Sequence, residues 1–265
     1  MLHSTFPKGG ALVVGGTGNV GAGVVRRLAQ ADVPVVFTYR HNADAARALE
    51  AQVREAGGQA FGQAMDMDDA RSIQAAVDVV LEKTGRLHTV ACAGGPFVNI
   101  NRMSALTPEE VSAFVQSDAV GVFRLVHTAL PALRAGGGGS ITLCSTIANR
   151  RVIKFDGISP FSKGAVEALV RQIAYEEGPN KIRCNGVAVA WVYDPRNVDT
   201  NKARETFANR EFFAAIVKQI SGLMRSHQPA PAPPDEAGNL FAFLASDQAR
   251  CVTGQIIAID DGATL

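Results

Sequence analysis

A cluster of glycines near the start of the chain stands between an apolar run and an apolar pattern with helical spacing. The run from Ala11 to Val14 predicts a short buried strand, and the glycines from Gly15 to Gly23 predict a tight turn. A helix is expected from about Asn19. Strand, glycine turn and helix open a dinucleotide-binding unit, in which the backbone approaches a pyrophosphate at a helix N-terminus. Such a turn can also bind nothing, so the rest of the chain has to decide.

Strand-like runs alternate with helical patterns along the chain. We expect strands over residues 11–14, 34–38, 60–64, 87–92, 140–145, 182–189 and 255–259. This alternation predicts an α/β fold: a single Rossmann-type, doubly wound domain over residues 1–265, with a seven-stranded parallel sheet flanked by helices. Residues 190–226 interrupt the pattern and predict a substrate loop or lid, or ordinary packing. Their apolar stripe consists of Phe207, Phe212, Phe213, Ile216, Val217 and Ile220.

Composition excludes several classes of function. A net charge of +1 in 265 residues gives no electrostatic case for nucleic acid, and no apolar run reaches the length of a membrane span. The N-terminus lacks the pattern of a signal peptide. The four cysteines lie far apart, which predicts reduced thiols, no metal site and a cytoplasmic protein.

The residues after the second and third predicted strands point to a cofactor. In a dinucleotide fold the tip of the second strand meets the adenosine ribose, where an acid favours NAD and a basic residue can hold the 2′-phosphate of NADP. Here Arg40 stands between Tyr39 and His41, without an acid, which favours NADP(H) unless Arg40 is a solvated turn residue. Asp66 follows the third strand, either near the adenine or as a plain turn residue.

Three further positions fit a site at the carboxyl ends of the strands. Ala93 and Gly94 follow the fourth strand and would let a cofactor pass close to the backbone, although a tight turn is the simpler alternative. Asp118 lies among apolar residues of a long predicted helix, and is either exposed or functional. Lys163 stands one turn into the helix after the fifth strand, an unusual place for a lysine that only packs.

With these motifs in place, the chain resembles the short-chain dehydrogenases/reductases from about Gly9 to Gly262. The resemblance rests on VVGGTGNVG, AMDMDD, ACAGG, LCST, SPFSKGAVEAL, IRCNGVAVAWV and FLASDQARCVTGQIIAIDDG. It implies the sheet order 3-2-1-4-5-6-7, a small-molecule substrate and a homodimer or homotetramer. It also implies cofactor contacts from Gly15, Thr17, Gly18, Asn19, Val20, Gly21, Tyr39, Arg40, His41, Asp66, Met67, Ala93, Gly94, Lys163, Val189 and Val192.

The catalytic positions implied by the resemblance are altered. Members of the family use Asn, Ser, Tyr and Lys, with the Tyr four residues before the Lys. The corresponding residues here are Asp118, Thr146, Ser159 and Lys163. A serine hydroxyl has too high a pKa to replace the tyrosine as a proton donor without help. The enoyl reductases of the family place their Tyr seven residues before the Lys, where this chain has Asp156.

Three functions are therefore open at this point. The first is an NADP(H)-dependent oxidoreductase with an unusual proton donor, for which Asp118, Asp156 or water could serve. The second is a non-redox enzyme that keeps the cofactor as a scaffold. The third is a binding or assembly protein without catalysis. The presence of Lys163 favours the first.

Overall fold

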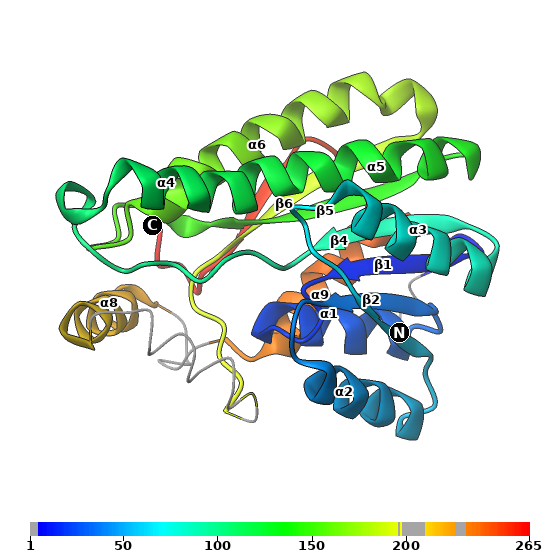
Figure 1. The fold of residues 1–265 in the computed structure, drawn as a ribbon, viewed down its shortest axis with the longest axis horizontal. Coiled ribbons are helices and arrows are strands. Elements are labelled where there is room, and N and C mark those ends of the chain that lie inside the picture. Colours follow the sequence, from blue (N-terminus) through cyan, green and yellow to red (C-terminus); the bar gives the residue numbers. More distant parts are fainter. Residues whose placement is uncertain (1–4, 196, 198–209, 226–231) are drawn as a thin grey trace.

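The computed structural model describes residues 5–195, 197, 210–225 and 232–265. Within them, seven strands form one parallel sheet in the order β3-β2-β1-β4-β5-β6-β7, which confirms the predicted architecture (Figure 1). The strands are β1 (Gly10–Val14), β2 (Val35–Tyr39), β3 (Ala60–Ala64), β4 (Leu87–Cys92), β5 (Gly139–Thr146), β6 (Ile182–Val189) and β7 (Ile256–Ile259). Because every pair is parallel, all carboxyl ends meet at one edge of the sheet.

Helices cover both faces of this sheet (Figure 1). The α-helices of the described residues are α1 (Asn19–Gln30), α2 (Ala43–Glu55), α3 (Ala70–Thr84), α4 (Pro108–Val115), α5 (Gly121–Ala135), α6 (Ile158–Glu176), α8 (Arg210–Leu223), which lies apart from the sheet, and α9 (Pro234–Ala245). One apolar cluster joins the sheet to α3, α5 and α6, and another joins it to α1, α2 and α9. Strand β1 supplies Leu12 and Val14 to the first cluster and Ala11 and Val13 to the second, as the two-residue period of a strand requires.

Side-chain caps fix the starts of three helices. The Asn42 side chain accepts the backbone N–H of Ala45 at the start of α2, and Asp69 accepts that of Arg71 at the start of α3. Thr107 and Glu110 form a reciprocal capping box at the start of α4. Each cap sets where the chain leaves the sheet edge and turns back along a helix.

The long helix expected from residue 108 to about 133 is interrupted. Between α4 and α5, residues Gln116–Val120 form a π-helix, which carries Asp118 at its centre. The widened turn rotates the following residues relative to an uninterrupted α-helix, and such segments are frequent at functional sites. Asp118 is fully buried, so the exposed alternative that the sequence left open for it is excluded. The apolar pattern of the sequence predicted the helix but carried no signal for the π-turn.

Only part of the interrupting segment after β6 is described. Phe207 lies outside the described residues, together with residues 196, 198–206, 208–209 and 226 of the predicted loop. Within α8, Ile216 and Ile220 are buried against Ile147 and Ile153 from the region after β5. In the described parts of the chain no helix is long and apolar enough to cross a membrane.

Candidate active site

The glycine turn after β1 is held in close backbone contact with the turn after β4. Gly15 has a φ of +76°, and a Cβ atom built on it would lie 2.4 Å from the Cα of Gly94. A Cβ on Gly21 would lie 2.0 Å from the carbonyl oxygen of Gly15. Side chains at these positions would force the two turns apart. The turn delivers the chain to α1, whose first residues have no side-chain cap, so backbone N–H groups of its first turn face the sheet edge.

The segment after β6 lies against this glycine turn. The Asn19 amide donates to the carbonyl of Val192 at 3.3 Å, and the Asn197 amide donates to the carbonyl of Thr17 at 2.9 Å. Two residues expected at the cofactor from opposite ends of the chain, Asn19 and Val192, are thus brought together. Asn197 had no recognisable signal in the sequence, because its partner is 180 residues away in the chain.

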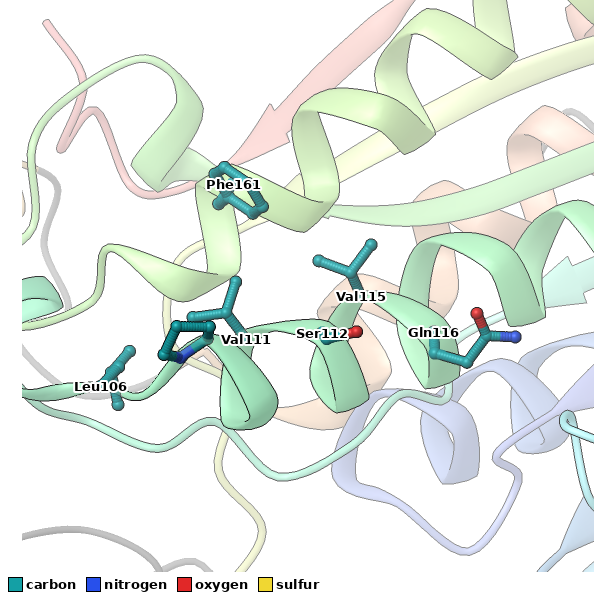
Figure 2. A pocket seen from close by; sticks show the side chains of 7 residues that line it. Leu106, Val111, Ser112, Val115, Gln116 and Phe161 are labelled. Carbon is teal, nitrogen blue, oxygen red and sulfur yellow. The ribbon is translucent and has the colours of Figure 1, made fainter.

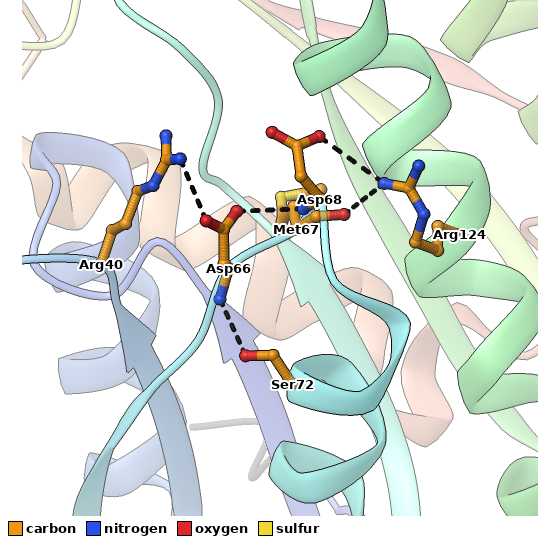
Figure 3. Close-up of polar contacts among 6 residues, drawn as sticks. All are labelled: Arg40, Asp66, Met67, Asp68, Ser72 and Arg124. Carbon is orange, nitrogen blue, oxygen red and sulfur yellow. Dashed lines mark hydrogen bonds and ion pairs between the residues drawn. The ribbon is translucent and has the colours of Figure 1, made fainter.

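The tips of β2 and β3 are joined by an ion pair. Nη2 of Arg40 lies 3.0 Å from Oδ2 of Asp66, and both side chains are partly exposed (Figure 3). A further basic group, Arg124 of α5, donates to the carbonyl of Met67 and lies 3.6 Å from Asp68 (Figure 3). Arg40, Asp66 and Met67, all expected at the cofactor, therefore lie together at the sheet edge, and Arg40 is exposed with one side of its guanidinium engaged.

A buried ion pair marks the centre of the site. Nζ of Lys163 on α6 donates to Oδ1 of Asp118 at 2.6 Å. The Asp118 side chain is fully buried and that of Lys163 is 14% exposed. The backbone of Gly95, which follows β4, lies beside both groups, since a Cβ there would be 3.2 Å from Asp118 Oδ1 and 3.8 Å from the ammonium. Two positions 45 residues apart in the chain thus form one charged unit.

The surroundings keep Lys163 charged. Burial acts to lower the pKa of the Lys163 ammonium, but the adjacent Asp118 carboxylate more than offsets this and raises that pKa above its ordinary value. The nearby Cys92 thiol is the opposite case, because burial raises its pKa to about 12 and leaves it neutral. Cys92 is therefore a packing residue of the site and not a nucleophile.

The remaining expected residues line the edge on both sides of Lys163. Thr146 ends β5, and its hydroxyl accepts the backbone N–H of Ala148 at 3.2 Å. Ser159 lies in the first turn of α6 and is 6% exposed. In the part of the chain that the structure describes, neither hydroxyl hydrogen bonds to the Lys163 ammonium. The hydrogen-bond partner of the lysine is Asp118 instead.

Asp156 lies in the chain just before the start of α6 at Ile158. Its Oδ1 accepts the backbone N–H of Ser159 at 3.4 Å. Burial raises the pKa of the Asp156 carboxyl above its ordinary value, although hydrogen bonds from the Ser159 hydroxyl and backbone N–H act to lower it. Asp156 is thus tied to the first turn of α6, which also carries Ser159, and Lys163 follows on the same helix.

An aromatic wall continues from Asp156 towards α8. Phe155 has a φ of +63°, a left-handed conformation that is strained for a bulky residue. Its ring stacks on Phe212 of α8 at a centroid distance of 4.1 Å and lies 5.6 Å from the Arg102 guanidinium. The Phe155 carbonyl accepts the backbone N–H of Asn101 at 2.9 Å, which ties this strained segment to the loop after β4.

A nicotinamide dinucleotide fits these residues. The glycine cradle at Gly15 and Gly21 leaves no room for side chains, α1 begins without a side-chain cap, and Arg40 provides an exposed cation at the β2 tip. Lys163 is a charged donor on the same edge. Among the described residues no group of three or more His, Cys, Asp or Glu side chains could hold a metal ion.

A separate groove lies on the outer side of α4 and α6. Figure 2 shows its lining, which includes Phe161 of α6 and Val111 and Val115 of α4. The lining contains none of Lys163, Ser159 and Thr146. This groove is therefore distinct from the edge where the charged groups gather.

Comparison with known proteins identifies relatives along the whole chain. The family model described as Enoyl-(Acyl carrier protein) reductase matches residues 15–264. An uncharacterized oxidoreductase of Methylorubrum extorquens is 29% identical over 252 residues, which cover 95% of this chain and 96% of the relative. Versicolorin reductase of Emericella nidulans is 27% identical, with 96% of this chain and 94% of the relative covered. A short-chain type dehydrogenase/reductase from Mycobacterium ulcerans superposes with a TM-score of 0.84 at 25% identity, over 98% of this chain and 91% of that one.

The buried ion pair predicts strong energetic coupling between its two members. Asp118→Asn leaves a buried ammonium without its counter-charge and should lower the free energy of unfolding by about 3 kcal/mol. Lys163→Met should cost a similar amount, because it leaves the buried carboxylate unpaired. The double variant should lose clearly less free energy of unfolding than the two single variants lose in sum, as measured by urea denaturation at neutral pH. Additive losses would show that the two charges do not stabilise one another.

Proposed function

Since the chain belongs to the short-chain dehydrogenase/reductase family and is an oxidoreductase, we propose that it uses NADP(H) to reduce or oxidise an apolar small molecule through a non-standard active site. Arg40 carries the cofactor assignment. It is an exposed guanidinium at the β2 tip, where its neighbours Tyr39 and His41 supply no carboxylate. A guanidinium is well suited to a 2′-phosphate, because it offers two parallel donors to a charged acceptor.

Each group at the edge has a role in this proposal. The bound cofactor would accept or supply a hydride, and the chain would position it. The glycine turn holds the pyrophosphate against the start of α1, and Lys163 donates to the nicotinamide ribose. Asp118 is buried beneath the lysine and positions it. Thr146 and Ser159 hydrogen bond to the substrate oxygen.

The proton donor is proposed to be Asp156, directly or through water. Asp118 is engaged by Lys163 and fully buried, so it is badly placed to exchange a proton with a substrate. The Ser159 hydroxyl is a poor acid near neutrality. Asp156 lies just before α6 and is hydrogen-bonded to the Ser159 N–H, and burial raises the pKa of its carboxyl, which keeps more of the acid form available. Simple ketones, which rely on a strong donor at the oxygen, should be poor substrates.

The substrate wall is proposed to come from residues 190–226. In their described part, Phe212 stacks on Phe155 beside Asp156, and Ile216 and Ile220 belong to an apolar cluster with Ile147. Such a wall suits an apolar substrate. The alternative of a cofactor-binding protein with non-redox chemistry or none is disfavoured by the reductases and dehydrogenases among its relatives.

A second copy of the chain is the proposed partner, as a homodimer or homotetramer. Exposed apolar rings lie on the outer face of α5 and α6: Phe123 is 54% exposed, Phe161 60% and Tyr175 84%. Phe161, Ala168 and Tyr175 recur every seven residues and therefore share one side of α6. Large aromatic side chains gathered on a helix face are typical of a surface that another protein covers.

We also propose that the protein is cytoplasmic. All four cysteines are free, and Cys92 and Cys184 are buried in strands. Thiols of this kind fit a reducing compartment.

The cofactor assignment predicts a selective effect of Arg40. Arg40→Ala should weaken NADPH binding by about 1–3 kcal/mol, because a charge-assisted contact to the 2′-phosphate is lost, while NADH binding stays within about twofold. The dissociation constants can be measured by the fluorescence of the reduced cofactor. Equal affinities of the wild type for NADPH and NADH would contradict the assignment.

The proton-donor assignment predicts a pH profile. A carboxyl with a raised pKa donates in its acid form, so the rate of reduction should fall as pH rises through that pKa. Asp156→Asn keeps the acceptor for the Ser159 N–H but cannot donate a proton. Asp156→Asn should lower kcat about 100-fold and remove the fall of the rate with rising pH, whereas Ser159→Ala should lower kcat only slightly.

Enones and small ketones with NADPH provide the substrates for this comparison. The reductase role itself is tested by the loss of NADPH absorbance in the wild type. Fast turnover of ketones that disappears in Ser159→Ala, with Asp156→Asn unaffected, would assign proton donation to Ser159 instead.

The proposed self-association predicts a change of mass. Phe161→Glu places a charge on the apolar face of α6 and should shift the protein to monomers in analytical ultracentrifugation. Val152→Glu is the matched control, because Val152 is also exposed, at 84%, but lies outside α4, α5 and α6. A wild type that sediments as a monomer at micromolar concentration would exclude the proposal.

A further inference from the structure

The partner of Arg40 is itself held in place. Oδ1 of Asp66 accepts the backbone N–H of Asp68 at 3.0 Å, and the backbone N–H of Asp66 donates to the Ser72 hydroxyl at 2.9 Å (Figure 3). The loop continues to Met67, whose carbonyl accepts a hydrogen bond from Arg124 of α5. The backbone of this loop is thus held by α3 and α5, the Asp66 carboxylate is held by the Asp68 N–H at Oδ1, and its Oδ2 is turned to the guanidinium.

This carboxylate is a permanent negative charge. The hydrogen bond from the Asp68 N–H lowers the pKa of the Asp66 carboxyl, burial acts in the other direction, and the Arg40 charge lowers it further. With its pKa below the ordinary value for an aspartate, Asp66 is ionised at neutral pH.

The same guanidinium cannot serve two anions without cost. Arg40 is 55% exposed and Asp66 41% exposed, so their ion pair is in contact with solvent and easily exchanged. A phosphate bound by Arg40 would either replace Asp66 at Nη2 or share the guanidinium with it. In the first case the Asp66 contact is lost, and in the second a dianion is held close to a fixed carboxylate.

We propose that Asp66 limits the selectivity for NADP(H) over NAD(H), because it competes with the 2′-phosphate for Arg40. The inference rests on the proposed function and names a second specificity-determining residue at the same site. Its opposite would be that Asp66 improves selectivity by orienting Arg40. The two cases differ in sign: removal of the Asp66 charge raises selectivity in the first and lowers it in the second.

The variant Asp66→Asn distinguishes between competition for Arg40 and orientation of Arg40. The amide oxygen can still accept the Asp68 N–H, so the loop keeps its anchor while the charge is removed. Any contact of Asp66 with the adenosine is common to NADH and NADPH and cancels in the ratio of their dissociation constants. We expect that ratio, Kd(NADH)/Kd(NADPH), to rise by about 3- to 5-fold, the upper part of the range for an exposed charge pair. Calorimetry with 2′,5′-ADP and 5′-AMP should show the same change without the nicotinamide.

Asp69→Asn is the matched control. It removes the same charge three residues further on, and asparagine caps a helix as well as aspartate does, so the start of α3 is preserved. The ratio Kd(NADH)/Kd(NADPH) of Asp69→Asn should stay within about twofold of the wild-type ratio. In the Arg40→Ala background, Asp66→Asn should no longer raise the ratio, since the guanidinium for which the anions compete is gone.

Three results would overturn the proposal: a lower ratio for Asp66→Asn, an equal rise for Asp69→Asn, or a full rise without Arg40. These are distinguishable from failure of the cofactor assignment itself. If Arg40→Ala reduces NADPH binding selectively but Asp66→Asn leaves the ratio unchanged, only the role of Asp66 is wrong. If Arg40→Ala has no selective effect, the assignment of NADP(H) is wrong.

Discussion

The buried contact between Lys163 and Asp118 is the interaction on which the arrangement of the site depends. An ammonium in the interior needs a counter-charge, and Asp118 provides it at 2.6 Å. The π-turn between α4 and α5 carries Asp118 into the interior, and α6 presents Lys163 from the other side. The position of α6, and with it Ser159 and Asp156, is therefore tied to the helix that follows β4.

This pairing also explains how a site without the expected tyrosine can keep its lysine. The Asp118 carboxylate lies beside the Lys163 ammonium and raises its pKa, so the lysine remains a cation without a tyrosine next to it. The acid proposed in place of the tyrosine is Asp156, which lies just before α6. The cofactor end of the edge is built on a similar principle, with Arg40 opposite Asp66.

The strands of the sheet could be predicted from the sequence because they depend on short-range patterns. The apolar run before Gly15 needs only a few neighbouring residues, and the strand that it predicted is confirmed. The pairing of Asp118 with Lys163 could not be predicted from these patterns. It depends on a local change of helix type and on a contact between residues 45 positions apart. The hydrogen bond from Asn197 to Thr17 could not be predicted either, because it also joins residues far apart in the chain.

A crystal structure of the complex with NADP(H) tests the central claim most directly. We expect Nζ of Lys163 to contact the nicotinamide ribose while it remains within hydrogen-bonding distance of Asp118. We expect the 2′-phosphate to lie against Arg40. A lysine amine turned to solvent, with the cofactor bound elsewhere on the sheet edge, would contradict it.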